Sequence, residues 1–383
     1  MSRAADKLMT VIFAGMITVP WLLYPFVRTP GQDTGENRQL TAFSTVMEAA
    51  LPELPDAFEA YYNDHVPFRS DLKKLWSNTN YLLLGEAVDE RVLVGKRDPD
   101  RAHVWLFYQA EEDGNPLKEA QGISTYDETA REEMYAVLAE NEKTMQDYGM
   151  ELYYFAGPNK ESVYPEFLPG YLKQYRPQSR LADFIAWLRT EHGYDRYIYP
   201  LAELRRASED GQTYYRQDIH WNAYGAYIGY KALMAVTHPE LDPAFTDDME
   251  LSYGPDQYLD TDLIRISGIR DLLLDQPAVV RFHDDFKVEY NHMFSDTVLE
   301  TRCEQAPVDR TVFLIGDSFR TDLIPYLERT YKHCFIMHRW DYRTIFIDWF
   351  WPDEVVMLSV ERYAPDNLSI RLKQEEETYP LDN

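Results

Sequence analysis

The chain has 383 residues, of which 45% are hydrophobic, 14% aromatic and 27% charged, and its formal net charge at pH 7 is -27. This composition is typical of a globular protein and excludes a disordered or fibrous chain. The length accommodates one large α/β domain with a smaller appendage, or two domains. After the first residues, no Lys/Arg stretch is dense enough to neutralise a run of phosphates, so no nucleic-acid partner is expected.

An apolar segment near the start predicts a membrane anchor. Leu8–Val27 contains no charged residue and has about the ~20 residues that span a bilayer as a helix. Arg3 and Lys7 precede it, with Asp6 offsetting part of their charge, and this flank would stay on the cytoplasmic side, leaving the rest of the chain outside. The alternatives are a cleavable signal peptide and a buried globular helix. The length of the run and the lack of an A-x-A-like site favour an uncleaved signal anchor over residues 1–28.

Residues 29–84 are expected to form a linker and a helical preface. Residues 28–37 (RTPGQDTGEN) are rich in Pro, Gly and polar residues, which is typical of a linker. The pattern from Phe43 to Leu84 is mostly helical. The catalytic domain is then predicted over residues 85–383.

Within residues 85–383, short apolar runs alternate with helical patterns, which indicates βαβ units and a mainly parallel sheet. Thr125 and Glu128 form a candidate capping box, and Gly193 is a candidate C-cap. The predicted strands are Arg91–Val94, Val104–Tyr108, Glu151–Ala156, Tyr197–Tyr199, Thr311–Ile315 and Val355–Val360; the predicted helices are 125–148, Ser179–His192 and Phe319–Tyr331.

Two cysteines, Cys303 and Cys334, are present. They could pair in an oxidising compartment, but Cys334 begins an apolar run and fits a buried thiol equally well. The sequence leaves both states open. Neither cysteine has the companions of a Cys-x-x-Cys redox or zinc site, and no cofactor or metal is expected.

Gly316-Asp317-Ser318 follows the apolar run 312–315 and precedes a helical pattern. Ser318 is therefore predicted at the carboxyl end of a buried strand, the edge where open α/β sheets bind ligands. Gly316 permits a tight turn, and N–H groups at the helix start would stabilise an oxyanion. The tripeptide alone is more often an ordinary turn, so its setting carries the prediction.

A serine nucleophile needs a base, and the base needs an orienting group. Asp218 and His220 are two residues apart; if the segment is extended, both side chains project to one side, and the carboxylate reaches one ring nitrogen while the other faces Ser318. Without Ser318, a surface pair or half of a metal site would be the better interpretation. Trp221 would supply an apolar wall.

Other polar or aromatic residues are weaker candidates. Tyr215 and its neighbour Tyr214 could stack on a sugar or pack within the fold, and packing is the default. Arg320 and Arg339 could contact the oxyanion or a sugar, although surface ion pairs are more common. His283-Asp284-Asp285 and Asp260-Thr261-Asp262 could be metal ligands, but consecutive residues point in different directions, so solvated loops are favoured.

The order of several motifs resembles the AlgJ/AlgX (DHHW) family of polysaccharide O-acetylation proteins, which carry a permuted SGNH-hydrolase-like domain. The matching segments are Asn63–Arg69, Val92–Lys96 with Trp105–Tyr108, Pro158–Pro165, Asp218–Trp221, Gly316–Phe319, Pro352–Val356 and Glu361-Arg362. Two departures are the longer stretch Arg97–His103 and Asn159 in place of the family's usual acid. No carbohydrate-binding module is expected in the residues after Arg362.

The resemblance implies a three-layer αβα fold, with Ser318 as nucleophile, His220 as base and Asp218 as orienting residue. Trp221, Asn159, Tyr215, Arg320 and Arg339 are the expected substrate-binding residues. The implied activity is an extracytoplasmic transfer of acetyl groups, through an acetyl-serine, to polysaccharide hydroxyls, beside a membrane-bound O-acyltransferase. The acidic net charge favours a neutral acceptor. A carbohydrate acetylesterase and a non-catalytic envelope scaffold are the alternatives.

Overall fold

The computed structural model describes residues 7–15, 18–19, 22, 40–65, 68–99, 103–241, 249–294 and 296–373. The chain forms two compact units: Met1–Asp89 with Ile264–Leu272, and Glu90–Leu263 with Leu273–Asn383. The sequence-based division did not include the excursion of 264–272 into the first unit.

The first unit is helical, as predicted for the preface: α2 (Phe43–Glu48), α3 (Leu54–Asp64) and α4 (Arg69–Leu84). Helix α4 ends at Gly85, which takes the left-handed conformation that glycine adopts without strain. Asn78 on α4 holds the 264–272 segment by donating to the Arg270 carbonyl and accepting from the Arg270 N–H, at 3.0 and 3.1 Å. These paired bonds explain why the segment belongs to this unit.

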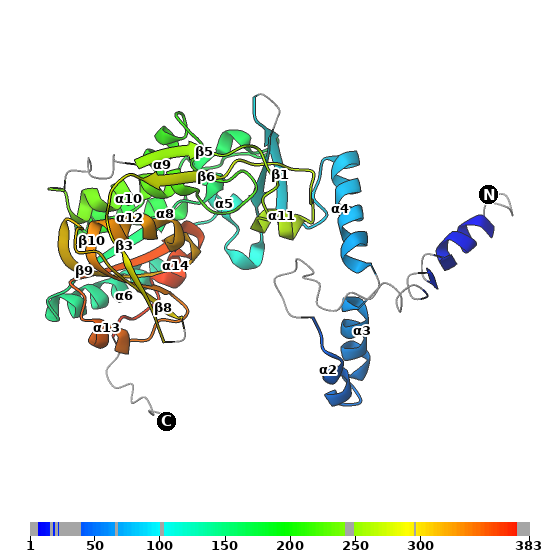
Figure 1. Ribbon diagram of the computed structural model, residues 1–383, viewed down its shortest axis with the longest axis horizontal. Coiled ribbons are helices and arrows are strands. Elements are labelled where there is room, and N and C mark those ends of the chain that lie inside the picture. The colour runs from blue at the N-terminus through cyan, green and yellow to red at the C-terminus, as the bar shows by residue number, and fades with distance from the viewer. Residues whose placement is uncertain are drawn as a thin grey trace. The chain divides into compact units, whose positions relative to one another are not determined.

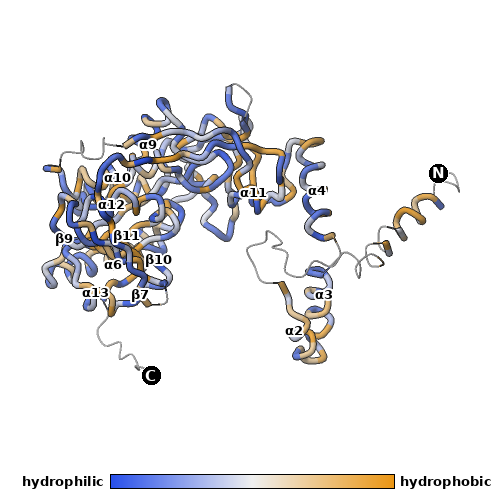
Figure 2. Tube along the Cα trace, in the orientation of Figure 1, coloured by the Kyte–Doolittle hydropathy of each residue, from blue (hydrophilic) through white to orange (hydrophobic). Residues whose placement is uncertain are grey.

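The predicted anchor Leu8–Val27 lies partly outside the described residues. Its described residues, 8–15, 18–19 and 22, are helical, and Figure 2 shows the first stretch to be mostly hydrophobic. Among the described residues, no helix has the length and apolarity needed to cross a membrane.

A seven-stranded sheet organises the second unit, in the order β4-β3-β11-β9-β10-β8-β7. Strands β4 to β10 in this order are parallel, whereas β8 pairs antiparallel with β10, and β7 antiparallel with β8. The sheet is therefore mixed. Its strands are β3 (Glu151–Gly157), β4 (Tyr197–Ile198), β7 (Glu289–Met293), β8 (Val298–Arg302), β9 (Val308–Gly316), β10 (Tyr331–His338) and β11 (Glu354–Val360).

Two predicted strands lie elsewhere. β1 (Val92–Arg97) and β2 (Val104–Tyr108) form a separate antiparallel ribbon, and β5 (Met249–Tyr253) and β6 (Ala278–Phe282) form another. The connection between β1 and β2 is short, and short connections join antiparallel strands, because parallel strands need a crossover.

Apolar side chains cover both faces of the large sheet. On β9, Val312 and Leu314 belong to one core cluster, while Phe313 and Ile315 belong to the other, as strand alternation requires. Helices α9 (Leu201–Ala207), α10 (Ala223–Thr237) and α12 (Ile324–Thr330) pack on the first face; α6 (Glu128–Asp147), α8 (Arg180–His192) and α13 (Ile345–Phe350) pack on the second. Figure 1 shows α10 and α12 on one side and α6 and α13 on the other. The predicted three-layer αβα arrangement is confirmed.

Local capping signals were partly correct. Gly193 ends α8 as predicted, and Ser179, predicted as the first residue of this helix, is its N-cap. Asp127 caps α6 in place of Thr125. The helix predicted over Phe319–Tyr331 is instead the 3₁₀ helix η4 (Ser318–Leu323) followed by α12, and Tyr331 begins β10. The short elements are α5 (Pro116–Ala120), α7 (Lys160–Val163), α11 (Asp262–Ser267), α14 (Ala364–Asn367), η1 (Glu111–Asp113), η2 (Pro165–Phe167) and η5 (Glu361–Tyr363).

Both cysteines are buried free thiols. Cys334 lies on β10, where burial raises the pKa of its thiol to about 12. Of the two states left open by the sequence, the structure has the unpaired one.

Candidate active site

Ser318 lies immediately beyond the carboxyl end of β9, as predicted, and its side of the turn is exposed to solvent. Gly316 leaves room for close packing there, because a Cβ atom would lie 3.0 Å from Cδ2 of Leu358 on β11, closer than an ordinary contact. The buried carboxylate of Asp317 fixes the turn by accepting from the Phe319 N–H at 3.0 Å and from the Val360 N–H at 2.7 Å. The nucleophile candidate is therefore exposed on a rigid support.

Asp218 and His220 lie in a tight turn, so the predicted extended segment is wrong. An antiparallel bridge between Tyr214 and Trp221 closes the turn, and the Tyr215 N–H donates to the His220 carbonyl at 3.3 Å. The His220 N–H donates to Oδ1 of Asp218 at 3.1 Å, the local side-chain-to-backbone bond that Asp favours. This turn, and not strand alternation, brings the two side chains together.

The three predicted catalytic side chains form one hydrogen-bonded line. Nδ1 of His220 is 2.7 Å from Oδ1 of Asp218, and Nε2 is 2.7 Å from Oγ of Ser318. With the proton on Nδ1 donated to the carboxylate, Nε2 can accept from the serine hydroxyl. This geometry would allow Ser318 to act as nucleophile, His220 as base and Asp218 as orienting carboxylate.

Asp218 and His220 each stabilise the charged form of the other. Burial alone would lower the pKa of His220, but the hydrogen bond and charge of Asp218 outweigh it and raise the pKa. Burial alone would raise the pKa of Asp218, yet its bonds with His220 and the nearby Lys160 charge hold that pKa below the usual range. The carboxylate therefore stays ionised and stabilises an imidazolium.

Asp262 is a second carboxylate at this site, and its Oδ2 is 3.8 Å from Nδ1 of His220. Its charge also raises the His220 pKa. Ligand atoms of Asp218, His220 and Asp262 lie within 4.8 Å of one another, a spacing that could hold a cation. The 2.7 Å contact between His220 and Asp218 is a direct hydrogen bond, however, and leaves no space for an ion between them.

Trp221 and Asn159 are interior residues, with 0% and 1% exposed. Trp221 packs on Phe319, with ring centroids 5.0 Å apart, and its Nε1 donates to the Phe319 carbonyl at 3.2 Å. The predicted substrate contacts are therefore not formed by these two side chains as they lie. Trp221 instead joins the turn carrying His220 to the turn carrying Ser318.

Of the other predicted substrate-binding residues, Tyr215 and Arg320 are more accessible to solvent than Trp221 and Asn159, whereas Arg339 is buried. Tyr215 and Arg320 are half-buried, and Arg320 donates to the Asp317 carbonyl at 2.9 Å. Arg339 is 7% exposed, pairs with Asp366 at 3.5 Å and stacks over Tyr363.

The backbone N–H groups after Ser318 were expected to stabilise an oxyanion. Those of Phe319 and Arg320 both donate to Asp317 in the structure.

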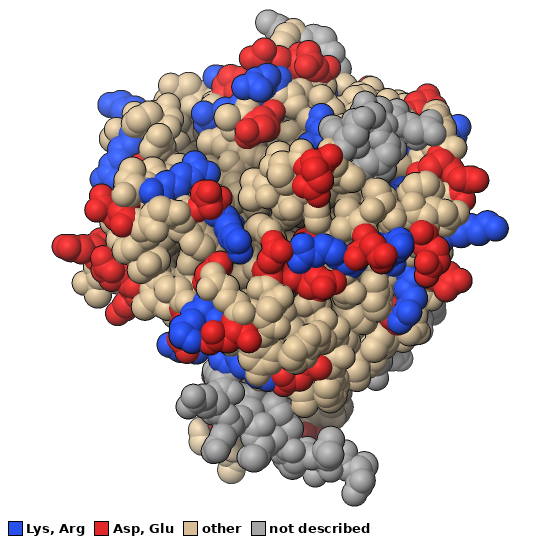
Figure 3. All heavy atoms as spheres, turned by 90° about the vertical axis from the view of Figure 1, so that its left-hand side faces the viewer, with Lys and Arg blue, Asp and Glu red and all other residues tan. Residues whose placement is uncertain are grey.

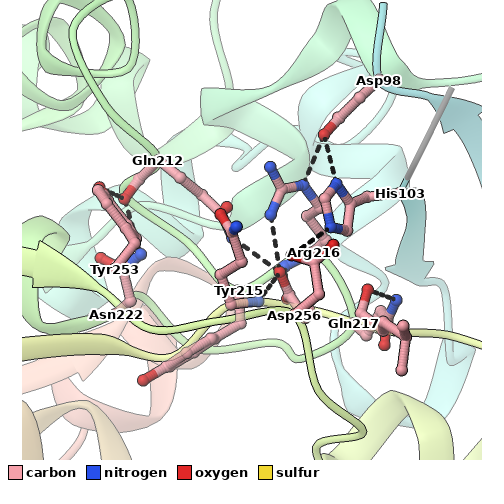
Figure 4. Close-up of polar contacts among 12 residues, drawn as sticks. Asp98, His103, Gln212, Tyr215, Arg216, Gln217, Asn222, Tyr253 and Asp256 are labelled. Carbon is pink, nitrogen blue, oxygen red and sulfur yellow. Dashed lines mark hydrogen bonds and ion pairs between the residues drawn. The ribbon is translucent and has the colours of Figure 1, made fainter. Parts of the chain in front are cut away.

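A polar network surrounds Arg216, which lies in the same turn as Asp218 and His220 (Figure 4). Arg216 donates from Nε to Asp98 and from Nη1 to Asp275, both at 2.8 Å, and its backbone N–H donates to Asp275 at 2.7 Å. His103 lies between Asp98 and Asp256, at 3.4 and 3.1 Å. The ring of Tyr215 extends away from this cluster in Figure 4.

A cavity of about 510 Å³ lies elsewhere, between α8, β4, α9 and α10, and none of the three catalytic candidates lines it. On the face drawn in Figure 3, acidic and basic side chains are interspersed, without a continuous basic region. Ser318 is exposed to solvent and does not line this cavity.

Comparison with known proteins is consistent with this geometry. The family model described as "SGNH hydrolase-like domain, acetyltransferase AlgX" matches residues 101–331. The probable alginate O-acetylase AlgJ of Pseudomonas aeruginosa is 27% identical over 191 residues, covering 49% of this chain and 44% of that protein. The chain therefore spans less than half the length of this curated relative.

Solved structures share the fold. Bacillus cereus PatB1 with a sulfonyl adduct superposes with a TM-score of 0.52 at 14% identity, covering 72% of this chain and 99% of that one. A DHHW family protein from Eubacterium siraeum gives 0.52 at 13% identity, covering 74% and 97%.

Proposed function

The chain belongs to the family of the SGNH hydrolase-like domain of acetyltransferase AlgX, and from that premise we propose that it transfers acetyl groups to hydroxyls of a polysaccharide. The hydrogen-bonded line from Asp218 through His220 to the exposed Ser318 is the observation that carries this proposal. The name of the AlgJ relatives, probable alginate O-acetylase, supports the reaction class.

In the first step, Oγ of Ser318 attacks the carbonyl carbon of an acetyl donor while Nε2 of His220 accepts the hydroxyl proton. The bond to the donor's leaving group breaks, and that group takes the proton from His220. The product is an acetyl ester on Ser318. Asp218 holds the Nδ1 proton throughout and stabilises the transient imidazolium.

In the second step, a sugar hydroxyl gives its proton to Nε2 of His220 and attacks the acetyl carbonyl carbon. Oγ of Ser318 leaves and takes the proton back, which regenerates the enzyme. The Ser318 backbone N–H would donate to the oxyanion of both tetrahedral intermediates.

We propose a neutral acceptor. Asp262 lies 3.8 Å from the base, and Asp322, one helical turn beyond Ser318, adds a further carboxyl whose pKa burial raises to about 6. At neutral pH both repel a uronate, although the relatives are named for alginate. Competition between a neutral and a uronate oligosaccharide of equal length tests this point directly.

The compartment and donor remain part of the proposal. The charge-free run Leu8–Val27 and its weakly positive flank support an anchored, extracytoplasmic enzyme. A membrane-bound O-acyltransferase would then supply acetyl groups from the cytoplasm. Digestion of the chain by protease added outside intact spheroplasts supports this orientation, and complete protection argues against it.

The deciding experiment supplies 4-nitrophenyl acetate as donor, with an oligosaccharide and water competing for the acetyl group. Acetylated oligosaccharide, detected by mass spectrometry and absent with Ser318→Ala, supports transfer. Free acetate alone supports an acetylesterase, the second candidate, which the solvent exposure of Ser318 favours because water reaches the same ester. No Ser318-dependent product supports the non-catalytic scaffold.

A further inference from the structure

Lys160, the first residue of α7, is almost completely buried, with 1% exposed. Its Nζ atom lies 3.3 Å from the carbonyl oxygen of Tyr215, 3.0 Å from that of Arg216 and 2.5 Å from that of Asp218. An ammonium group has three N–H donors, so this side chain directs all of them to one turn. That turn carries the orienting carboxylate of the proposed active site.

A buried ammonium at this place is costly, because burial disfavours its charge and lowers the pKa of Lys160 to about 8. The negative groups that oppose this effect are Glu161 on α7, Asp218 in the turn and Asp275 beyond it. The rings of Trp105 and Phe107 lie 5.9 and 5.3 Å from Nζ. An apolar side chain of similar size would avoid the cost of the buried charge but would leave the three carbonyl groups without this donor.

The turn needs these donors. Residues 216–220 are not part of a strand ladder, so their inward carbonyl groups require partners from elsewhere in the fold. Asp98 and Asp275 accept from the Arg216 side chain, and Asp275 also accepts from the Arg216 N–H. Figure 4 shows the contact between Arg216 and Asp98. Lys160 binds the carbonyl groups, including that of Asp218 itself.

We infer that Lys160 is a positioning residue of the acetyl-transfer site, whose ammonium group fixes the 215–218 backbone so that the Asp218 carboxylate meets Nδ1 of His220. This inference rests on the proposed function. Lys160 does not touch the reacting atoms; it acts through Asp218.

A double-mutant cycle tests the inference. The rate of Ser318 acetylation by 4-nitrophenyl acetate is measured for the wild type, Lys160→Met, Asp218→Asn and the double variant. Misplacement of a catalytic group by about 1 Å costs on the order of 100-fold, and we expect a loss of about this size for Lys160→Met. If Lys160 acts through Asp218, adding Lys160→Met to Asp218→Asn changes the rate by less than about threefold. A merely structural role would multiply the two losses.

A proton NMR resonance from the hydrogen bond between His220 and Asp218 gives a second readout. It is expected far downfield in the wild type and absent from Lys160→Met, whose folding is checked by thermal unfolding. Lys160→Gln keeps two N–H donors and should retain an intermediate rate. Lys118→Met removes a lysine that pairs with Glu111 on the surface, and should behave as wild type.

The outcomes separate the two proposals. A wild type that forms no acetyl-Ser318 contradicts the proposed function. An active wild type with an equally active Lys160→Met, or with multiplicative losses in the cycle, overturns the inference alone. Failure of both Lys160 variants to fold would also overturn it, by assigning the residue to stability.

Discussion

Nε2 of His220 lies 2.7 Å from Oγ of Ser318, although 98 positions separate the two residues in the chain. Their neighbours repeat the contact: Trp221 donates from Nε1 to the carbonyl of Phe319 at 3.2 Å. Two turns that are far apart in the sequence are thus joined twice, once by His220 and Ser318 and once by the buried Trp221 side chain. The buried bond with Trp221 ties the residue after His220 to the residue after Ser318.

Asp218→Asn should lower the acetylation rate of Ser318 by roughly 10³- to 10⁴-fold. An amide cannot accept the Nδ1 proton in the same way as the carboxylate, so His220 takes a tautomer that no longer accepts from Ser318. Stopped-flow release of 4-nitrophenol measures the rate. Asp309→Asn, at an exposed site paired with Lys332, is the matched control, and equal rates for both variants would exclude the orienting role.

The pH dependence of acetylation should show an acid limb with its midpoint above pH 6.5, because the pKa of His220 is raised by Asp218 and Asp262 despite its burial. A protonated His220 cannot accept the serine proton, so the rate is lost as pH falls through that pKa. Asp262→Asn removes one of the charges that raise the pKa, so its acid limb should move to lower pH. A limb that stays in place or moves upward would contradict this contact, and Asp309→Asn should leave it unmoved.

Gly225→Ala should destabilise the fold by about 1–3 kcal/mol and reduce acetylation. Gly225 lies in the first turn of α10, where an added Cβ would collide with the Thr213 carbonyl oxygen and come within 2.9 Å of Trp221. Asp218 and His220 lie in the segment between Thr213 and Trp221, so a displacement of these two neighbours would move them. Gly170→Ala, where no atom lies within 4 Å of an added Cβ, is the control. The free energy of unfolding, measured by chemical denaturation, and the acetylation rate are compared for Gly225→Ala and Gly170→Ala. Equal values for the two variants would mean that the turn tolerates the displacement.

Local patterns predicted the elements whose cause is local. The run Val104–Tyr108 is a strand with those bounds, and Ser179 and Gly193 delimit α8, because periodicity and capping reside in a few neighbouring residues. The placement of Ser318 after β9 followed from the same kind of signal. The antiparallel additions β7 and β8 were missed because their side chains are mostly polar or exposed, and their pairing is decided across the chain.

The predicted proximity of Asp218, His220 and Ser318 is found in the structure, but the backbone conformation that produces it differs from the predicted one. Asp218 and His220 were expected to share a strand face, whereas an Asp-specific turn brings them together. Lys160 was visible only as part of a matching motif, since its three carbonyl partners lie 55 to 58 positions away. Asp262 belongs to a polar cluster for which a solvated loop was the favoured interpretation. Its relation to the site is visible only in the structure, where its carboxylate lies 3.8 Å from His220.

The most direct test of the account is the mass of the protein after brief exposure to an acetyl donor. The account predicts one added acetyl group, located on Ser318 by peptide mapping, lost on addition of the oligosaccharide acceptor and absent from Ser318→Ala and from a His220→Ala variant. A folded wild-type protein that carries no acetyl group on Ser318, or that acetylates the acceptor equally well as Ser318→Ala, would contradict it.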